Sequence, residues 1–246
     1  MSTPTPNPDY LVKLRKQFPA AEGTLALQFE KPAGFDFVAG QAMDLTLLQP
    51  RETDAEGNTR YFSIASAPHE DFLMVATRLR DTAFKRQLPG LEAGAEVKIS
   101  APGGSLRLHN NPARPAVFLA GGIGITPVRS ILLRAAREKL AHRIFLFYSN
   151  RRPEDAAFLD ELTILQQENP HFTLIATMTG MAKSALPWNG ETKRLDRALL
   201  DKHLGEAKSP VYYVIGPPGM VTGVRAMLNQ TGVDDDDIRA EDFGGY

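Results

Sequence analysis

The spacing of apolar residues differs before and after residue 113: the first part shows only strand-like runs, and the second shows strand-like and helix-like segments in turn. Between residues 10 and 108, short alternating or β-branched apolar runs recur at close intervals, at 24–29, 43–48, 61–65, 72–79 and 97–100. Glycine or proline separates many of these runs, which is typical of an antiparallel barrel or sandwich. We therefore predict an all-β first half.

In the second half, segments with the apolar pattern of a strand alternate with segments that have the apolar pattern of a helix. Apolar strands are predicted at 116–120, 144–148, 172–179 and 211–215, helices at 126–139, 154–168 and 219–229, and a short terminal run at 239–243. Strands that alternate with helices indicate parallel βαβ units. Residues 180–194 lack a clear period, and we predict a loop there. The expected architecture is an N-terminal antiparallel β-barrel domain over 1–112 and a C-terminal doubly wound α/β domain, with a parallel sheet, over 113–246.

Composition narrows the possible functions. The 246 residues include no cysteine, which excludes disulfides, a cysteine nucleophile and a cysteine-ligated iron–sulfur cluster within this sequence. The net charge of −1 gives no general reason to expect nucleic acid or an anionic membrane as a partner. The opening residues are polar and proline-rich, and no apolar run approaches the roughly 18 residues of a membrane span, so we expect a cytoplasmic protein. The five histidines are scattered without ligand spacing, and we assign no metal.

The strongest local motif is LAGGIGITP at 119–127, where an apolar strand enters glycines and then a helix that Thr126 and Pro127 open. Glycines let backbone amides approach a phosphate, and a helix N-terminus adds unpaired N–H donors. This predicts a site for a dinucleotide pyrophosphate. An ordinary strand-turn-helix connection would have the same appearance.

Two further motifs lie in the all-β half. In RYFSIAS at 60–66, Arg60 and Phe62 share one face of a strand, which places a guanidinium for a phosphate beside an aromatic ring. Tyr61, as the adjacent residue, points to the opposite face. PGGSL at 102–106 can cradle a phosphate or simply form a turn. Taken alone, an ordinary strand explains the first motif better than a ligand site does.

Taken together, five motifs resemble the ferredoxin-NADP(+) reductase superfamily. RYFSIAS, PGGSL, LAGGIGITP, YYVIGPPGM at 212–220 and EDFGGY at 241–246 occur in the order and approximate spacing of that family and cover almost the whole chain. The resemblance implies a flavin-binding β-barrel followed by an NAD(P)-binding α/β domain, without an iron–sulfur domain. It also implies a bound flavin, FAD rather than FMN, that passes electrons between NAD(P)H and a separate carrier such as ferredoxin or flavodoxin.

The resemblance assigns roles to individual residues. Arg60 would hold the flavin pyrophosphate, Phe62 would stack on the ring and Ser63 would address N5. Gly104 and Ser105 would contact the flavin phosphates. The remaining assignments are Gly122, Gly124 and Thr126 to the nicotinamide dinucleotide, Gly216 and Pro217 to the nicotinamide pocket, and Glu241, Phe243 and Tyr246 to closure of the site, with Ser63, Glu241 and Phe243 as the catalytic group.

Three departures from the family pattern bear on function. Phe62 replaces the usual tyrosine, as in free-flavin reductases of the superfamily, and Ile215 stands where many relatives have cysteine. The second phosphate segment, usually glycine-rich, reads RLRDTAFKR at 78–86. Its four cations could bind flavin phosphates or an acidic electron-transfer protein, or the segment could be a solvated surface strand.

The sequence is compatible with either NADPH or NADH and with more than one type of flavoprotein. Arg151 and Arg152 follow the strand ending at Tyr148, where the adenosine ribose is expected, and arginine suits a 2′-phosphate, so we favour NADPH over NADH. NADH-using relatives can also carry arginine nearby. Besides a flavin-dependent reductase of a carrier protein, the sequence is compatible with an NAD(P)H:flavin reductase with dissociable flavin, or with a flavin-binding electron-channelling subunit of a larger complex.

Overall fold

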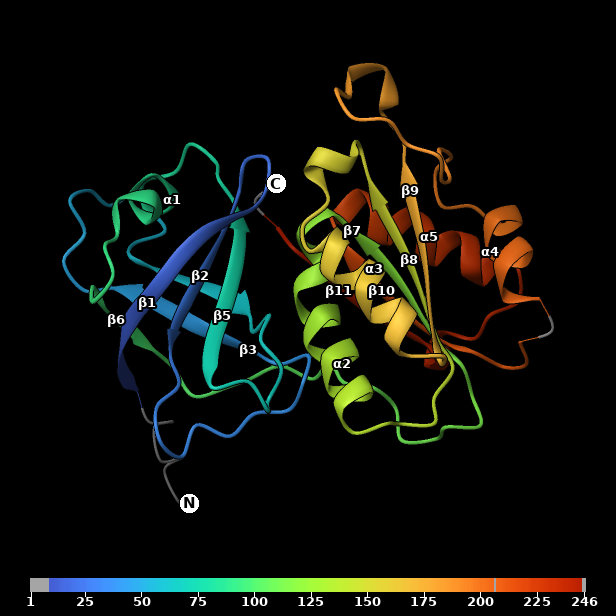
Figure 1. Ribbon diagram of the computed structural model, residues 1–246, viewed down its shortest axis with the longest axis horizontal. Helices are drawn as coiled ribbons and strands as arrows, with labels where there is room; N and C mark the ends of the chain where they lie inside the picture. Colours follow the sequence, from blue (N-terminus) through green and yellow to red (C-terminus); the bar gives the residue numbers. More distant parts are fainter. Residues whose placement is uncertain (1–8, 206, 245–246) are drawn as a thin grey trace.

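The computed structural model describes residues 9–205 and 207–244 as two lobes side by side (Figure 1). The first lobe is a six-stranded antiparallel sheet with strand order β4-β3-β6-β1-β2-β5. Its strands are β1 (Tyr10–Ala21), β2 (Thr24–Glu30), β3 (Ala42–Leu47), β4 (Thr59–Ser63), β5 (Phe72–Arg78) and β6 (Glu96–Ile99). The short helix α1 (Ala83–Gln87) follows β5.

The curved sheet of the first lobe encloses its own core. Alternate residues of its strands point inward, so Val12 and Leu14 of β1 are at most 2% exposed while their neighbours on the strand are exposed. They pack with Phe29, Met43 and other apolar side chains in one cluster. Strands β4 and β5 form the two edges of the sheet, which leaves a seam in the barrel between them.

The second lobe is a parallel sheet covered by helices on both faces (Figure 1). The strand order is β11-β10-β7-β8-β9. Its elements are β7 (Ala116–Gly121), α2 (Ile125–Arg137), β8 (Ile144–Asn150), α3 (Leu159–Glu168), β9 (Phe172–Met178), α4 (Arg197–Leu204), β10 (Val211–Gly216), α5 (Pro218–Gln230) and β11 (Ile238–Asp242). Helices α2 and α3 pack on one face, and α4 and α5 on the other.

Burial explains why β7 and β10 consist of aliphatic, aromatic and glycine residues. Every residue of β7 and of β10 is buried, as expected for parallel strands that are covered on both sides. Successive side chains of β7 enter the two opposite cores, with Phe118 on the α2 face and Leu119 on the α5 face. The predicted fold class, an antiparallel barrel-like lobe followed by a doubly wound α/β lobe, is confirmed.

The structure corrects three details of the prediction. The helix predicted at 154–168 begins only at Leu159, because Pro153–Asp155 forms a 3-10 turn and Phe158 has a left-handed φ of 61°. Helix α4 falls in a region where we predicted no helix, although Asp196 caps it by accepting from the N–H of Leu199 at 2.8 Å. The surface-strand alternative for 78–86 is wrong, because β5 ends at Arg78 and α1 follows.

Polar contacts join the lobes on two sides. On one side, the Glu22 N–H donates to the Glu154 carbonyl at 2.8 Å and the Arg78 guanidinium donates to the Asp155 carbonyl at 3.1 Å. On the other side, the Ser130 hydroxyl of α2 donates to the carbonyl of Ser66 at 2.6 Å. Among the helices that the structure describes, none has the length and apolar character that crossing a bilayer requires.

Candidate active site

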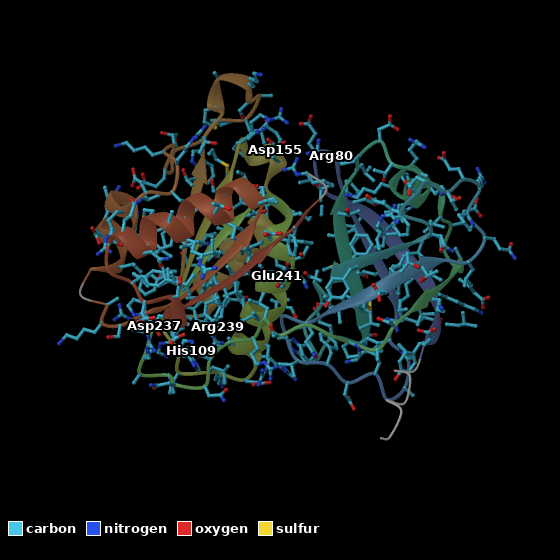
Figure 2. All side chains as sticks on the ribbon, turned by 180° about the vertical axis from the view of Figure 1, so that it is seen from behind. Arg80, His109, Asp155, Asp237, Arg239 and Glu241 are labelled. Carbon is cyan, nitrogen blue, oxygen red and sulfur yellow. The ribbon has the colours of Figure 1, made fainter. Side chains whose placement is uncertain are left out.

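A cavity of about 400 Å³ lies between the two lobes. We call it the interlobe cleft. Glu241, at the end of the last strand, is located at this boundary (Figure 2). The lining residues are Arg60, Tyr61, Phe62, Ser63, Ala76, Thr77, Arg78 and Lys85 from the first lobe, and Ile123, Thr126, Glu241, Asp242, Phe243 and Gly244 from the second.

A second cavity, of about 470 Å³, is on the outer surface of the first lobe. Lys13, Leu47, Gln87 and Glu96 are among its lining residues. None of the residues that line it belongs to the motifs that predict a ligand site, and it receives nothing from the second lobe. The interlobe cleft, which collects residues from β4, the glycine turn and the C-terminal segment, is therefore the candidate site.

Arg60 lies in the wall of the cleft, but its guanidinium is already engaged. Nη1 donates to the carbonyls of Glu56 and Gly57 at 3.0 Å and of Thr59 at 2.8 Å. Nη2 is 3.0 Å from the Asp54 carboxylate and also pairs with the Glu56 carboxylate. An anion that binds Arg60 must therefore compete with the loop that precedes β4.

Phe62 and Tyr61 both line the cleft. Phe62 is partly buried, pairs with Met43 across the sheet and has its ring centroid 6.0 Å from that of Phe84. Tyr61 points to the other face, as expected, and is 54% exposed, with its hydroxyl 3.2 Å from the place a Cβ on Gly104 would occupy. Because β4 is an edge strand, both of its faces can border the cleft. The cleft thus has a phenol, which the sequence prediction did not provide.

Ser63 and the glycine turn at 102–106 are neighbours through β3. Ala42 pairs with Ser63 on one side and with Gly103 on the other, with backbone hydrogen bonds of 2.8 and 2.9 Å to Gly103. Within the described residues the Ser63 hydroxyl makes no hydrogen bond, so it is free to donate into the cleft. Gly104 has a φ of +90°, which favours glycine; Gly104 and Ser105 are both exposed, and neither lines the cavity itself.

The glycine turn of the second lobe contributes Thr126 to the cleft directly. Thr126 is 3% exposed, and its hydroxyl donates to the Ile123 carbonyl at 3.0 Å. Gly122 adopts a φ of +53° with open space around it, whereas a Cβ on Gly124 would lie 2.5 Å from the Ile215 carbonyl oxygen. Gly124 is thus required for close packing against β10, whether or not a phosphate binds.

The C-terminal segment returns the chain to the cleft. Gly216 ends β10 and pairs with Asp242 of β11, and its carbonyl accepts from the Phe243 N–H at 3.0 Å. Pro217 precedes α5 and, like Gly216, does not line the cavity. Phe243 does line it. Tyr246, predicted to help close the site, lies outside the described residues.

Glu241 is a partly buried acidic side chain of the cleft. Burial raises the pKa of its carboxyl above the usual range, and the neighbouring charge of Asp242 adds to this. The carboxylate has no hydrogen-bond or ion-pair partner within the part of the chain that the structure describes. Burial also raises the pKa of the Tyr61 phenol, and the charge of Glu241 contributes, so the two groups are close. Burial therefore favours the protonated form of Glu241 more in the folded protein than in free solution.

Arg151 and Arg152, which follow β8, differ in whether their guanidinium groups already form ion pairs. Arg152 pairs with Asp155 at 2.8 Å and with Glu22 of the first lobe at 3.1 Å. The Arg151 side chain is exposed and has no ion pair among the described residues. The structure therefore leaves Arg151, rather than Arg152, available to a ligand at this edge of the sheet.

Arg78, Lys85 and Ile123 line the cleft although we assigned them no specific role from the sequence. Arg78 and Lys85 belong to the cationic segment at 78–86. The sequence pointed to this segment as a whole but could not distinguish these two cations from Arg80 and Arg86. Only the turn between β5 and α1 determines which cations face the cleft.

Comparison with known proteins agrees with this architecture. Residues 118–226 match the sequence family of the oxidoreductase NAD-binding domain. The chain is 28% identical over 228 residues to terephthalate 1,2-dioxygenase, reductase component 2, of Comamonas sp, covering 91% of this chain and 65% of that protein. It is 31% identical over 204 residues to one subunit of the Na(+)-translocating NADH-quinone reductase of Haemophilus influenzae (strain PittEE), covering 76% and 48%. The chain thus spans about half to two thirds of the length of these curated relatives.

Solved structures show the same fold at low sequence identity. A ferredoxin NADP+ reductase from Neisseria gonorrhoeae with bound FAD and NADP superposes with a TM-score of 0.77 at 21% identity, covering 95% of this chain and 98% of that one. A flavohemoglobin from Malassezia yamatoensis with bound FAD and heme gives 0.79 at 22% identity, covering 96% and 60%. The fold and the cleft define a protein with a barrel and a nucleotide-binding lobe. This chain has the same two-domain fold as these solved structures, and residues 118–226 of its second lobe are similar to the oxidoreductase NAD-binding domain, which agrees with the fold expected from the motifs.

Proposed function

We propose that this chain is a flavin-dependent NAD(P)H oxidoreductase that passes electrons to a separate carrier protein such as ferredoxin or flavodoxin. The observation that carries the proposal is the interlobe cleft, which brings Ser63 of the barrel, Thr126 of the glycine turn and Glu241 of the last strand into one cavity. A volume of about 400 Å³ lies in the range typical of cofactor sites, and the lining combines aromatic rings with charged and hydroxyl groups.

The residues present fit an FAD. Cations line one part of the cleft, the aromatic rings of Phe62 and Tyr61 border another, and the Ser63 hydroxyl is free to donate. Bound flavin would supply hydride acceptance from the nicotinamide and release of electrons one at a time. We favour FAD over FMN because the motifs resemble those of FAD-binding proteins.

The protein's own contribution is positioning and exclusion of water. With a flavin in the cleft, Ser63 would donate a hydrogen bond to the ring, Glu241 would offer a carboxyl group for proton transfer, and Phe243 would cover the cavity. The turn at Gly122 and Thr126 receives the dinucleotide, with Gly216 and Pro217 beyond it. We favour NADPH, because Arg151 is exposed and has no ion pair with any described residue at the edge where a 2′-phosphate is expected.

We also propose that the flavin-binding domain comprises residues 1–112 and the NAD(P)-binding domain residues 113–246. The last strand of the antiparallel sheet ends at Ile99 and the first of the parallel sheet begins at Ala116, which supports a boundary between them.

A flavin reductase with dissociable flavin is the second candidate, favoured by Phe62, whose ring cannot donate a hydrogen bond. An electron-channelling subunit of a larger complex is a third, since relatives are named as a reductase component and as one subunit of a quinone reductase. An absorption spectrum of the purified protein before and after NADPH tests the proposal. A flavin spectrum that NADPH bleaches supports it, whereas failure of both FAD and FMN to bind at micromolar concentration overturns it.

A further inference from the structure

The outer face of the barrel that meets the second lobe is apolar and built largely from small residues. In β5, Val75 points into the barrel core, whereas Met74 and Ala76 point outward. Ala76 pairs with Ala26 of β2 across the sheet. Ala65 follows β4, and its N–H donates to the Met74 carbonyl at 2.7 Å. We call Ala26, Ala65, Met74 and Ala76 the barrel socket; all four are at most 5% exposed, although a barrel face turned to water would be polar.

The glycine turn of the second lobe covers the barrel socket. Ile123, in the middle of the turn Gly122–Gly124, packs with the four socket residues in one cluster and is 8% exposed. Phe158 and Phe243 pack against this cluster from the same lobe and are partly buried. Strand β5 lies on the side of the barrel that faces the second lobe (Figure 1). Among the described residues of the second lobe, Ile123 is thus the side chain that is buried in this contact.

The neighbouring glycines determine where Ile123 can point. A Cβ on Gly124 would lie 2.5 Å from the Ile215 carbonyl oxygen, and a Cβ on Gly121 would overlap Sδ of Met220. These two glycines therefore lie directly against β10 and α5. The backbone of the turn is held on that side, and the side chain of Ile123 extends to the barrel instead. The turn is thus confined between β10 on one side and the barrel socket on the other.

Close packing makes this contact a determinant of distance. Protein interiors are packed to the density of organic crystals, so a side chain in a socket of small residues cannot approach further without displacing its neighbours. Removing its methyl groups leaves space that the two lobes can close only by moving. The socket is part of the lobe that carries Phe62 and Ser63, and Ile123 is part of the turn that leads to Thr126. The packing of Ile123 therefore sets the separation of these two walls of the cleft.

We propose that Ile123 is a positioning residue, which holds the dinucleotide-binding turn at the distance from the flavin wall that hydride transfer requires. The inference rests on the proposed function, because it takes the barrel side of the cleft to bind the flavin and the turn to bind the dinucleotide. In that reaction a hydride, with its two electrons, leaves the reduced nicotinamide, which is oxidised, and reaches the flavin, which is reduced. Each lobe holds its own ligand, so a change at Ile123 alters the transfer and neither binding step. A misplacement of about 1 Å can slow such a step about a hundredfold.

The test exchanges side chains between the lobes. Ile123→Ala empties the socket, Ala76→Ile overfills it, and the combined variant keeps the total volume. The measurements are the rate of flavin reduction by NADPH and by NADH after rapid mixing, and the dissociation constants of FAD and of the oxidised dinucleotides. We expect each single variant to reduce its flavin about tenfold more slowly than wild type, with unchanged dissociation constants, because only the distance between the ligands has changed. The combined variant should regain most of the rate, and Ile123→Val should retain most of it.

Two further measurements separate positioning from stability. Ile144→Ala makes the same deletion in the core of the second lobe, where Ile144 is 1% exposed and does not line the cleft. It should lower the thermal unfolding midpoint and leave the rate of flavin reduction unchanged. In the ligand-free protein, denaturant unfolding should show that the combined variant is more stable than the sum of the two single changes predicts, because Ile123 and Ala76 belong to the same packed cluster.

The outcomes separate this inference from the function on which it rests. If Ile123→Ala reduces its flavin at the wild-type rate, the role of Ile123 is overturned while the flavin and dinucleotide sites stand. Because Ile123 lines the cleft, a slower reduction that follows from weaker binding of FAD or of the dinucleotide would make it a ligand contact, which also overturns the inference. A combined variant that is folded but as slow as the single variants would exclude packing as the cause. If wild type binds no flavin or is not reduced, the proposed function fails and the inference fails with it.

Discussion

Arg129 of α2 and Glu70 of the first lobe form a buried ion pair across the lobe boundary, with 3.1 Å between Nη1 and Oε2. The Arg129 side chain is 6% exposed. Its Nη1 also donates to the Ala65 carbonyl at 2.7 Å, and its other nitrogens bind the Glu161 carboxylate at 2.6 Å. The pair thus fixes α2, which follows the glycine turn, to the segment just after Ser63, and so sets the distance across the cleft.

Replacing Arg129 should destabilise the protein. Arg129→Met retains most of the volume but leaves the carboxylate of Glu70 and the carbonyl of Ala65 without their partner. We expect a loss of about 2–4 kcal/mol in the free energy of unfolding, below the full value for a buried pair because Glu161 is 38% exposed. Denaturant unfolding measures the change.

The control for Arg129 is on the same helix. Arg134 pairs with Glu138 at 2.9 Å in an exposed position, so Arg134→Met should cost less than about 1 kcal/mol. If the two variants lose the same stability, the pair across the boundary contributes no more than a surface ion pair.

Gly124 should tolerate no side chain. A Cβ there would lie 2.5 Å from the backbone oxygen of Ile215, so Gly124→Ala must displace β10 or the turn. We expect a loss of about 1–3 kcal/mol in unfolding free energy, together with slower reduction by NAD(P)H. Gly219→Ala is the matched control, since no atom lies within 4 Å of its Cβ position, and it should be neutral. Equal stability of the two variants would contradict the packing role of Gly124.

Phe62→Tyr should tighten FAD binding. Phe62 borders the cleft, and a hydroxyl added there can donate a hydrogen bond that phenylalanine lacks. We expect a gain of about 0.5–1.5 kcal/mol in binding free energy, measured by fluorescence quenching of added FAD. Weaker or equal binding would mean that the packing of Phe62 against Phe84 excludes the hydroxyl, and would remove the missing hydroxyl as support for the dissociable-flavin alternative.

Ionisation of the Glu241 carboxyl should lower the free energy of unfolding at neutral pH. Its folded-state pKa is raised by burial, so the folded protein holds the proton more tightly than the unfolded chain does. The free energy of unfolding is therefore highest below pH 4.5, the ordinary pKa of the group, and falls as the pH rises through the folded-state pKa. Glu241→Gln should accordingly be more stable than wild type at pH 7, with a gain that shrinks toward pH 4.5.

The measurement for Glu241 is denaturant unfolding of both proteins across that pH range. Asp242→Asn provides a second arm, because the charge of Asp242 contributes to the raised pKa of Glu241, and its removal should shift the transition to lower pH. A stability difference between Glu241→Gln and wild type that does not change with pH would show that ionisation of Glu241 is not its cause.

Substitutions of Arg151 and Arg152 should have different effects, the first on nucleotide recognition and the second on stability. Arg151→Gln should raise the KM for NADPH about five- to tenfold, because a guanidinium that contacts a 2′-phosphate is lost, with no change for NADH. Arg152→Gln should instead lower the thermal unfolding midpoint through loss of its contacts to Asp155 and Glu22, with little effect on either KM. Steady-state kinetics with both nucleotides would contradict the assignment if Arg151→Gln affects NADPH and NADH alike.

The sequence alone indicated most of the architecture, because local periodicity reflects which faces are buried. The alternating runs at 24–29 and 72–79 and the continuous apolar runs at 116–120 and 211–215 predicted an antiparallel and a parallel sheet. Helix α3 was predicted too early, since Phe158 leaves the helical conformation in a partly buried position against the core. Helix α4 has a cap and a buried face that could have been recognised.

For the candidate site, the sequence determined which residue types occur in which motifs, and hence the class of ligand. The tertiary structure decided which of them meet. Ser63, Thr126 and Glu241 are far apart in the chain and share one cleft because α2 packs against the barrel and β11 pairs with β10. Within the described residues, it also decided that Arg152 and Arg86 form ion pairs with carboxylates while Arg151 and Lys85 form none. Motifs follow from local backbone requirements, whereas charge compensation depends on carboxylates brought close by the packing of distant segments.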